Sequence, residues 1–368
     1  MESIVHIQGS LTSSLTPLFL VHAVSGLAFS YFALPSLSTH LPDSQTRPVY
    51  GISSPVYDGE LSQPYRLPKS IREIAIQYIT LIKDIQPEGP YLLGGWSMGG
   101  MIALKMAEIL RQRGERVLHV VMIDSGNPRH YPDFVGEWES DLVLKTTYNS
   151  IAGRLGARQL PITLGGGITE PESPAIGDDD DEIVMDFTGL RDLDTPDSSD
   201  VEDNEDEDDE DEADSYMAYM AKQLFRYVKN GINIITKVKH TEPLVPTPNK
   251  AIQAVADIGD LPTPPLSPST SFISLPSFEA FAPRVSDTYT GPVTLVKCTA
   301  LGKVNLMLSH ERKSAIQKIF FDERMGWSKE ELPNLRVMKV NCTHDRCFDP
   351  NFVGQIADRL RKVLRTVY

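Results

Sequence analysis

The sequence has few of the features that mark secreted, membrane-bound or nucleic-acid-binding proteins. Its 368 residues include only three cysteines, which predicts reduced thiols and a cytoplasmic protein rather than a disulfide scaffold. No run of roughly 18 or more apolar residues occurs, so we expect no membrane span. Met1–Leu11 lacks a basic region before an apolar run, so no secretory signal is predicted. Basic clusters with interleaved aromatic residues are also missing, so no nucleic-acid partner is expected.

A complete set of metal ligands is missing as well. Cys342, His344 and Cys347 lie close together in one short segment. A structural zinc site needs four ligands, and this segment supplies no fourth. We therefore predict no metal site in this segment.

The net charge of −15 comes from one segment. Residues 178–214 contain 21 acidic side chains and a single basic one, Arg191, so the other residues together carry a charge of +5. This segment has too little apolar content to offset the entropy of ordering, and we predict that it is disordered. Residues 241–270 are rich in proline, serine and threonine and are expected to be flexible.

Apolar runs and helical periodicities alternate along most of the rest of the chain. The runs are too continuous for a half-exposed sheet, which predicts an α/β fold with a mostly parallel sheet and helices on both faces. Residues 1–125 and 291–368 would form the core, and residues 126–290 a long lid insertion. We expect strands at Ile4–Gln8, Pro17–His22, Val49–Ser53, Tyr91–Gly94, Val117–Ile123, Pro292–Cys298 and Leu335–Asn341. Expected helices are Leu27–Leu41, Ile71–Ile85, Met98–Arg113, Ser215–Val238, His310–Phe321 and a last one starting at Asp349.

A G-x-S-x-G pentapeptide, Gly95–Gly99, lies between an expected strand and an expected helix. This is the context of the nucleophile elbow of α/β-hydrolases, in which a tight turn forces the serine side chain above the sheet. We therefore predict that Ser97 is a nucleophile. The amide of Met98, at a helix N-terminus, could then donate a hydrogen bond to a developing oxyanion.

A serine nucleophile needs a histidine base, which in this fold follows it in the chain. Two histidines lie beyond the insertion, His310 and His344. His344 follows the last expected strand, at the sheet edge that carries the elbow. We favour His344, because His310 opens a helix on a loop that is less well placed.

In many α/β-hydrolases the acid that orients the base follows the strand before the last one. Here that strand is Pro292–Cys298, and residues 299–305 after it contain no Asp or Glu. Asp124 ends the strand that follows the elbow helix, on the correct edge, and we predict that it is the acid. Asp345 is the alternative, although a sequence neighbour usually points away from His344.

The second oxyanion donor is expected in the loop after Pro17–His22, where Ala23 and Val24 are the candidates. Small residues after them let this loop approach the elbow. His22, at the end of the strand, is interpreted as structural.

Four segments together resemble the thioesterase domains of nonribosomal peptide and polyketide synthases, which have the α/β-hydrolase fold: PLFLVHAVSG, GPYLLGGWSMGG, VVMIDS and THDRCF. In that family the acid follows the strand after the nucleophile helix, where Asp124 stands. The resemblance implies that Ser97 attacks a thioester on the phosphopantetheine arm of an acyl or peptidyl carrier protein. An acyl-enzyme would form and then be released, without a metal or bound cofactor.

The chain also departs from the family pattern. Its lid region is far longer than the usual compact helical unit, and no carrier or other synthase domain is evident. We therefore expect a free-standing thioesterase of secondary-metabolite biosynthesis that acts on a separate synthase. The alternatives are a carboxylic-ester hydrolase, an acyltransferase or cyclase of the same fold, and a non-catalytic interaction protein that presents the acidic segment.

Overall fold

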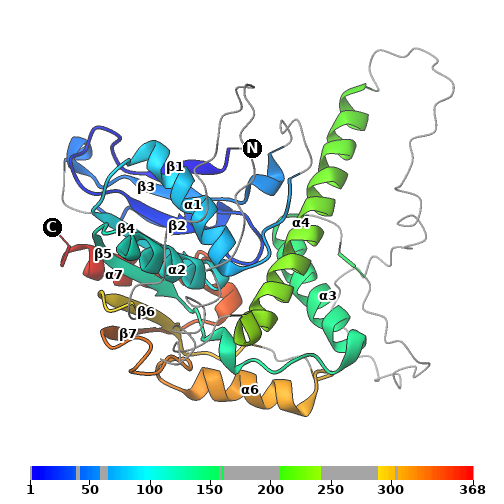
Figure 1. Cartoon of the computed structure of the whole chain (residues 1–368). Helices are drawn as coiled ribbons and strands as arrows, with labels where there is room; N and C mark the ends of the chain where they lie inside the picture. The colour runs from blue at the N-terminus through cyan, green and yellow to red at the C-terminus, as the bar shows by residue number, and fades with distance from the viewer. Residues whose placement is uncertain are drawn as a thin grey trace, which may run out of the picture.

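A computed structural model describes residues 2–38, 42–58, 65–156, 159–160, 208–241, 289–302 and 306–367 (Figure 1). Within these residues, seven strands form one sheet in the order β1-β3-β2-β4-β5-β6-β7. β1 runs antiparallel to β3, and every other neighbouring pair is parallel. The strands are β1 (Ile4–Gln8), β2 (Leu18–Val21), β3 (Val49–Ile52), β4 (Tyr91–Trp96), β5 (Val117–Ile123), β6 (Val293–Cys298) and β7 (Leu335–Val340).

Helices cover both faces of this sheet because alternate strand residues point to opposite sides. In β2, Phe19 and Val21 pack with α1 (Ile71–Ile85), α2 (Met98–Gln112) and α6 (His310–Phe321). Leu18 and Leu20 pack on the side of α7 (Val353–Leu364). The mostly parallel sheet with helices on both faces is the predicted α/β-hydrolase fold.

The lid insertion between β5 and β6 carries two helices, α3 (Gly136–Arg154) and α4 (Asp208–Thr241). Figure 1 shows them beside each other beyond one end of the sheet. Tyr148 of α3 and Tyr227 of α4 belong to one buried cluster that also includes Leu27 and Tyr57 of the core. The lid is therefore packed onto the body of the protein. Among the described residues, no helix combines the length and the apolar content needed to cross a bilayer.

Two predictions about local structure are wrong. The helix expected at Leu27–Leu41 is only a short 3-10 helix, η1 (Phe29–Ala33). Leu34 already has extended backbone dihedrals, as expected for a residue that precedes a proline. The acidic segment is not disordered throughout, because α4 begins at Asp208. Residues 178–207 and 242–270 lie outside the described residues.

Candidate active site

Ser97 lies in a sharp turn between β4 and α2. Its backbone has φ +56° and ψ −123°, a strained conformation for a residue with a side chain. Small neighbours make the turn possible. A Cβ on Gly95 would lie 2.3 Å from the backbone of Gly99, and one on Gly99 would lie 2.2 Å from the carbonyl oxygen of Val21. The pentapeptide therefore has the geometry of a nucleophile elbow.

A continuous hydrogen-bond chain joins the three residues predicted to react. The Oγ atom of Ser97 lies 3.1 Å from Nε2 of His344. Nδ1 of His344 lies 2.8 Å from Oδ2 of Asp124. The other carboxylate oxygen, Oδ1, accepts a hydrogen bond of 2.8 Å from the backbone N–H of Cys298. With the imidazole proton on Nδ1, Nε2 is free to accept the proton of Ser97.

Backbone strain is concentrated at this site. Among the described residues, only Ser97, Asp124 and Met325 combine a side chain with a positive φ. Two of these three residues belong to the hydrogen-bond chain. Strained residues of this kind persist only where the surrounding structure holds them, and they cluster at functional sites.

The surroundings of His344 stabilise the protonated form of its imidazole, compared with a histidine in water. Burial alone would lower the pKa of His344, but the hydrogen bond to Asp124 and the charge of Asp124 outweigh it, and the pKa is raised above its ordinary value. Asp124 itself is buried. The carboxylate therefore stabilises the positive charge that His344 acquires when it takes a proton.

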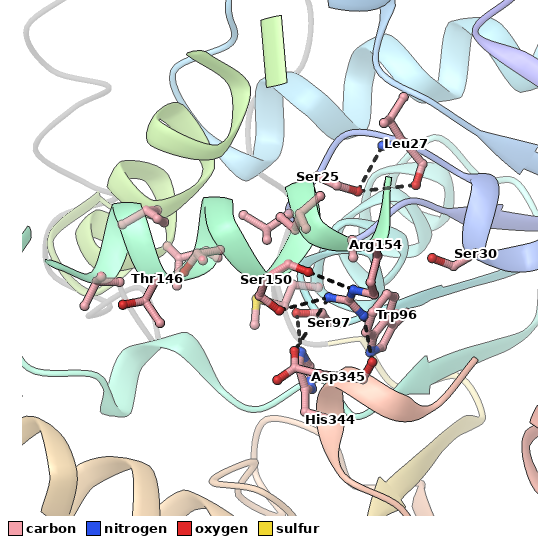
Figure 2. Close-up of a pocket in the computed structure, with 18 of the residues that line it drawn as sticks. Ser25, Leu27, Ser30, Trp96, Ser97, Thr146, Ser150, Arg154, His344 and Asp345 are labelled. Carbon is pink, nitrogen blue, oxygen red and sulfur yellow. Dashed lines mark hydrogen bonds and ion pairs between the residues drawn. The ribbon is translucent and has the colours of Figure 1, made fainter. Parts of the chain in front are cut away.

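A pocket of about 380 Å³ opens at Ser97 and His344. Its walls come from the loop after β2, from α3 and from α4. Figure 2 shows Thr146, Ser150 and Arg154 of α3 along one side of it, with Ser97 and His344 near its Arg154 end. The lid helices therefore shape the space that a substrate would occupy.

The predicted oxyanion donors lie where they could serve this pocket. Ala23 and Val24 line it. Met98 begins α2, and the first amides of a helix have no intrahelical partner. His22 is fully buried away from the pocket, within hydrogen-bond distance of hydroxyls of Tyr78 and Tyr227. Burial lowers the pKa of His22 to about 4, which agrees with a structural interpretation.

Neither alternative residue belongs to the hydrogen-bond chain. His310 begins α6 and does not line the pocket. Asp345 directs its exposed carboxylate toward Arg154, with 3.9 Å between Oδ1 and Nη2. The structure therefore brings Asp124, and not Asp345, to the imidazole of His344.

Arg154 is a site residue that the sequence analysis did not identify. Its Nη1 donates a hydrogen bond of 2.6 Å to the backbone oxygen of Asp345. Its guanidinium lies over the ring of Trp96, 5.7 Å from the centroid. One side chain of the lid thus contacts the neighbours of both His344 and Ser97.

The cysteines are grouped differently from the sequence expectation. Cys298 joins Cys342 and Cys347, with sulfur–sulfur distances of 3.5 and 3.2 Å from its Sγ. All three thiols are buried and free. His344 is not a member of the group, because its two ring nitrogens face Ser97 and Asp124. The cluster lies behind the loop that carries His344, and Cys347 donates to the backbone oxygen of His344 at 3.1 Å.

Comparison with known proteins gives the family. Residues 16–143 match the thioesterase domain model. Thioesterase pytI of Aspergillus terreus is 34% identical over the whole of both chains. The chain belongs to the thioesterase family. It is a hydrolase that acts on thioester bonds.

Other relatives agree with this family. Thioesterase pynI of Aspergillus niger is 33% identical over the full length of both chains. A non-reducing polyketide synthase of Cladonia grayi, PKS16, is 39% identical over 128 residues, which are 35% of this chain and 6% of the synthase. The crystal structure of the NocB thioesterase domain in a covalent complex with a fluorophosphonate nocardicin G analogue has a TM-score of 0.51 and 19% identity, with 98% of this chain and 99% of that one covered. That structural likeness supports the fold.

Proposed function

We propose that this thioesterase releases an acyl, polyketide or peptidyl chain from the phosphopantetheine thioester of a separate carrier protein in the cytoplasm, as a step of secondary-metabolite biosynthesis. The observation that carries the proposal is the hydrogen-bond chain from Ser97 through His344 to Asp124, of which Ser97 and His344 line the pocket. The similarity of residues in this protein to part of a polyketide synthase also supports a carrier-bound substrate.

The proposed reaction has two steps. His344 takes the proton of Ser97 while Oγ attacks the thioester carbonyl, and amides of Met98 and of Ala23 or Val24 stabilise the oxyanion. The carrier thiol leaves with the proton from His344, and an acyl-enzyme remains on Ser97. His344 then activates a water molecule that releases the acid. These steps use protein groups and water, without a metal or bound cofactor.

Replacing Ser97 tests this proposal directly. We expect Ser97→Ala to lower thiol release from a panel of acyl-N-acetylcysteamine thioesters by at least about 10³-fold, because the covalent step is lost. Ser44→Ala, at an exposed serine that does not line the pocket, should keep wild-type rates. A fluorophosphonate probe should label the wild type and Ser44→Ala, but not Ser97→Ala.

Each other outcome of this experiment has a definite meaning. Faster cleavage of matched oxygen esters than of thioesters would favour a carboxylic-ester hydrolase, and a cyclic or transferred product by mass would favour a cyclase or acyltransferase. Neither thiol release nor labelling of the folded wild type would contradict the proposed role of Ser97.

The pH profile provides an independent test. His344 must be neutral to accept a proton from Ser97, so kcat/KM should fall as pH decreases through the pKa of His344. Because Asp124 holds that pKa above its ordinary value, the acid limb should lie above about pH 6.5. Asp124→Asn should move the limb of its residual activity to lower pH, because both the hydrogen bond to a carboxylate and its charge are lost. An unmoved limb would contradict the assignment of the limb to His344.

A further inference from the structure

The lid helix α4 packs directly on the loop after β2, where the second oxyanion donor is predicted. A Cβ built on Gly231 of α4 would lie 2.9 Å from Cγ2 of Val24 and 3.2 Å from Sδ of Met98. One turn earlier in α4, a ring carbon of Tyr227 lies 2.8 Å from the position of a Cβ on Gly26. The two glycines therefore allow α4 to approach this loop closely.

A buried hydrogen-bond chain joins α4 to the same loop. The hydroxyl of Tyr227 lies 3.2 Å from Nε2 of His22 and 3.3 Å from the hydroxyl of Tyr78 on α1. The hydroxyl of Tyr78 is also hydrogen-bonded to Nε2 of His22, and Nδ1 of His22 is hydrogen-bonded to the carbonyl oxygen of Ala23. All three rings are almost completely buried, so water does not compete for these bonds.

The acceptors of this chain determine where its protons lie. A carbonyl oxygen can only accept, so Nδ1 of His22 carries a proton and donates it to Ala23. Burial lowers the pKa of His22 to about 4, so the ring is neutral at neutral pH and Nε2 accepts from a tyrosine hydroxyl. Tyr78 and Tyr227 therefore favour the tautomer of His22 that binds the carbonyl of Ala23.

The carbonyl of Ala23 and the N–H of Val24 belong to one peptide group. This peptide is trans, so the two groups point in opposite directions. The oxygen is held by His22 and by the backbone N–H of Gly26, at 3.1 Å. The N–H of Val24 therefore points away from His22, and it has no hydrogen-bond acceptor among the described residues. Val24 lines the pocket, whereas His22 does not.

We propose that Tyr227 and His22 are positioning residues for the oxyanion hole. Through them the lid helix α4 holds the Ala23–Val24 peptide so that the amide of Val24, rather than that of Ala23, is the second oxyanion donor. This inference rests on the proposed function, because the oxyanion forms only when Ser97 attacks a thioester. An amide that binds the oxyanion acts mainly in the transition state, so its displacement should lower kcat and leave KM nearly unchanged.

The first experiment measures kcat and KM for the acyl-N-acetylcysteamine thioester that the wild type cleaves fastest. His22→Leu removes the donor to Ala23 and should lower kcat by about 10- to 100-fold, up to the low end of the loss of a whole oxyanion donor, because the bond from Gly26 remains. His22→Asn should restore kcat to within about threefold of wild type, since its side-chain NH₂ can replace Nδ1–H. Tyr227→Phe, which removes one hydroxyl, should lower kcat by about five- to tenfold.

A double variant tests whether the two residues act through one path. In the His22→Leu background, Tyr227→Phe should lower kcat by less than about twofold more, because the hydroxyl no longer has an imidazole to hold. Tyr148→Phe is the matched control. Tyr148 of α3 is buried in the same apolar cluster as Tyr227, but its hydroxyl has no hydrogen-bond partner among the described residues, so kcat should stay at the wild-type value.

Two further readouts separate positioning from a general loosening of the lid. Ser97 adds to the carbon of an alkyl trifluoromethyl ketone, and the ketone oxygen then occupies the oxyanion hole. This ketone should bind each variant more weakly in proportion to the loss of kcat, whereas the matching unreactive thioether should bind wild type and variants alike. The acid limb of the pH profile should not move, because His344 keeps its bond to Asp124.

The outcomes distinguish this inference from the proposed function. Wild-type kcat in folded Tyr227→Phe, equal weakening of ketone and thioether binding, or a full further loss in the double variant would overturn the inference and leave the proposed function intact. Circular dichroism establishes folding, and if His22→Leu does not fold, the comparison of Tyr227→Phe with Tyr148→Phe decides. If the wild type shows no Ser97-dependent thiol release, the proposed function fails, and the inference fails with it.

Discussion

Asp124→Asn should lower kcat for thioester hydrolysis by about 10⁴-fold, although it only replaces one carboxylate oxygen with an NH₂ group. Asp124 has φ +47°, and asparagine tolerates this left-handed region about as well as aspartate. The substitution should therefore leave the fold in place. Its effect comes from hydrogen-bond direction, because an amide has one accepting oxygen and one donating nitrogen.

The surroundings of Asp124 determine which way the new amide would face. The backbone N–H of Cys298 requires an acceptor at the position of Oδ1, so the amide oxygen should stay there. The amide NH₂ then faces Nδ1 of His344 in place of Oδ2. Nδ1 must accept, so the imidazole proton moves to Nε2, where it points at Ser97. In that tautomer His344 cannot take the proton of Ser97.

Asp345→Asn is the matched control. It removes the same charge one residue from His344, but the carboxylate of Asp345 is exposed and 3.9 Å from Arg154, and the shorter contact of Arg154 is to the backbone. Exposed pairs of this kind contribute little, so kcat should stay within about threefold of wild type. Steady-state kinetics with one thioester on both variants checks this. A larger loss in Asp345→Asn than in Asp124→Asn would contradict the assignment of the acid.

The core of the fold and the predicted triad could be found from the sequence because each depends on local patterns. Strands buried on both faces read as continuous apolar runs, and the elbow needs glycine at fixed positions. Parallel strands end at a common edge, so a residue just after β5 and one just after β7 can meet there. This is why Asp124 and His344 are brought together despite their separation in the sequence.

Helix α3 could not be found in the same way. Tyr148, Ile151 and Ala152 are buried, but the adjacent face carries Thr146, Thr147 and Ser150 toward the pocket. A helix in which buried apolar residues alternate with hydroxyl-bearing residues that line a pocket lacks the single apolar stripe that marks a surface helix. For this reason the sequence predicts no helix at residues 136–154, where α3 lies.

Contacts between distant segments were equally hidden. Cys298 ends β6, whereas Cys342 and Cys347 flank the loop of His344, so only the pairing of β6 with β7 brings the three thiols together. Arg154 reaches the active site from the far end of a helix that was not predicted. A single charged residue such as Arg154 forms no repeating pattern in the sequence. Its contacts depend on how distant segments pack, so they cannot be predicted from the sequence.

The buried ion pair between Glu139 and Arg312 is the clearest example, and it leads to the second large prediction. Glu139, near the start of α3, is completely buried, and its Oε1 lies 3.3 Å from Nε of Arg312 on α6. The same carboxylate accepts hydrogen bonds from the backbone N–H of Val135, at 2.8 Å, and of Ser309, at 3.0 Å. It therefore joins the first turns of α3 and α6.

Glu139→Ala should lower the free energy of unfolding by about 3–5 kcal/mol, because removing one partner of a buried pair leaves the other charge without compensation. Arg312 lines the pocket and stacks on Phe134, with 4.2 Å from its guanidinium carbon to the ring centroid. The loss should therefore also loosen the end of the pocket formed by Phe134 and Arg312. Urea unfolding followed by circular dichroism measures the change.

Two further variants make this prediction specific. Asp133→Asn removes an exposed carboxylate that pairs with Lys239 and His240, and should have little effect on stability because exposed ion pairs are weak. The double variant Glu139→Ala, Arg312→Met removes both charges and should recover part of the stability lost in Glu139→Ala, since no unpaired charge remains in the interior. If Glu139→Ala were no less stable than Asp133→Asn, the pair would not join α3 to the core. The position of the lid along the pocket would then depend on the apolar contacts between α3 and α4 and on Arg154.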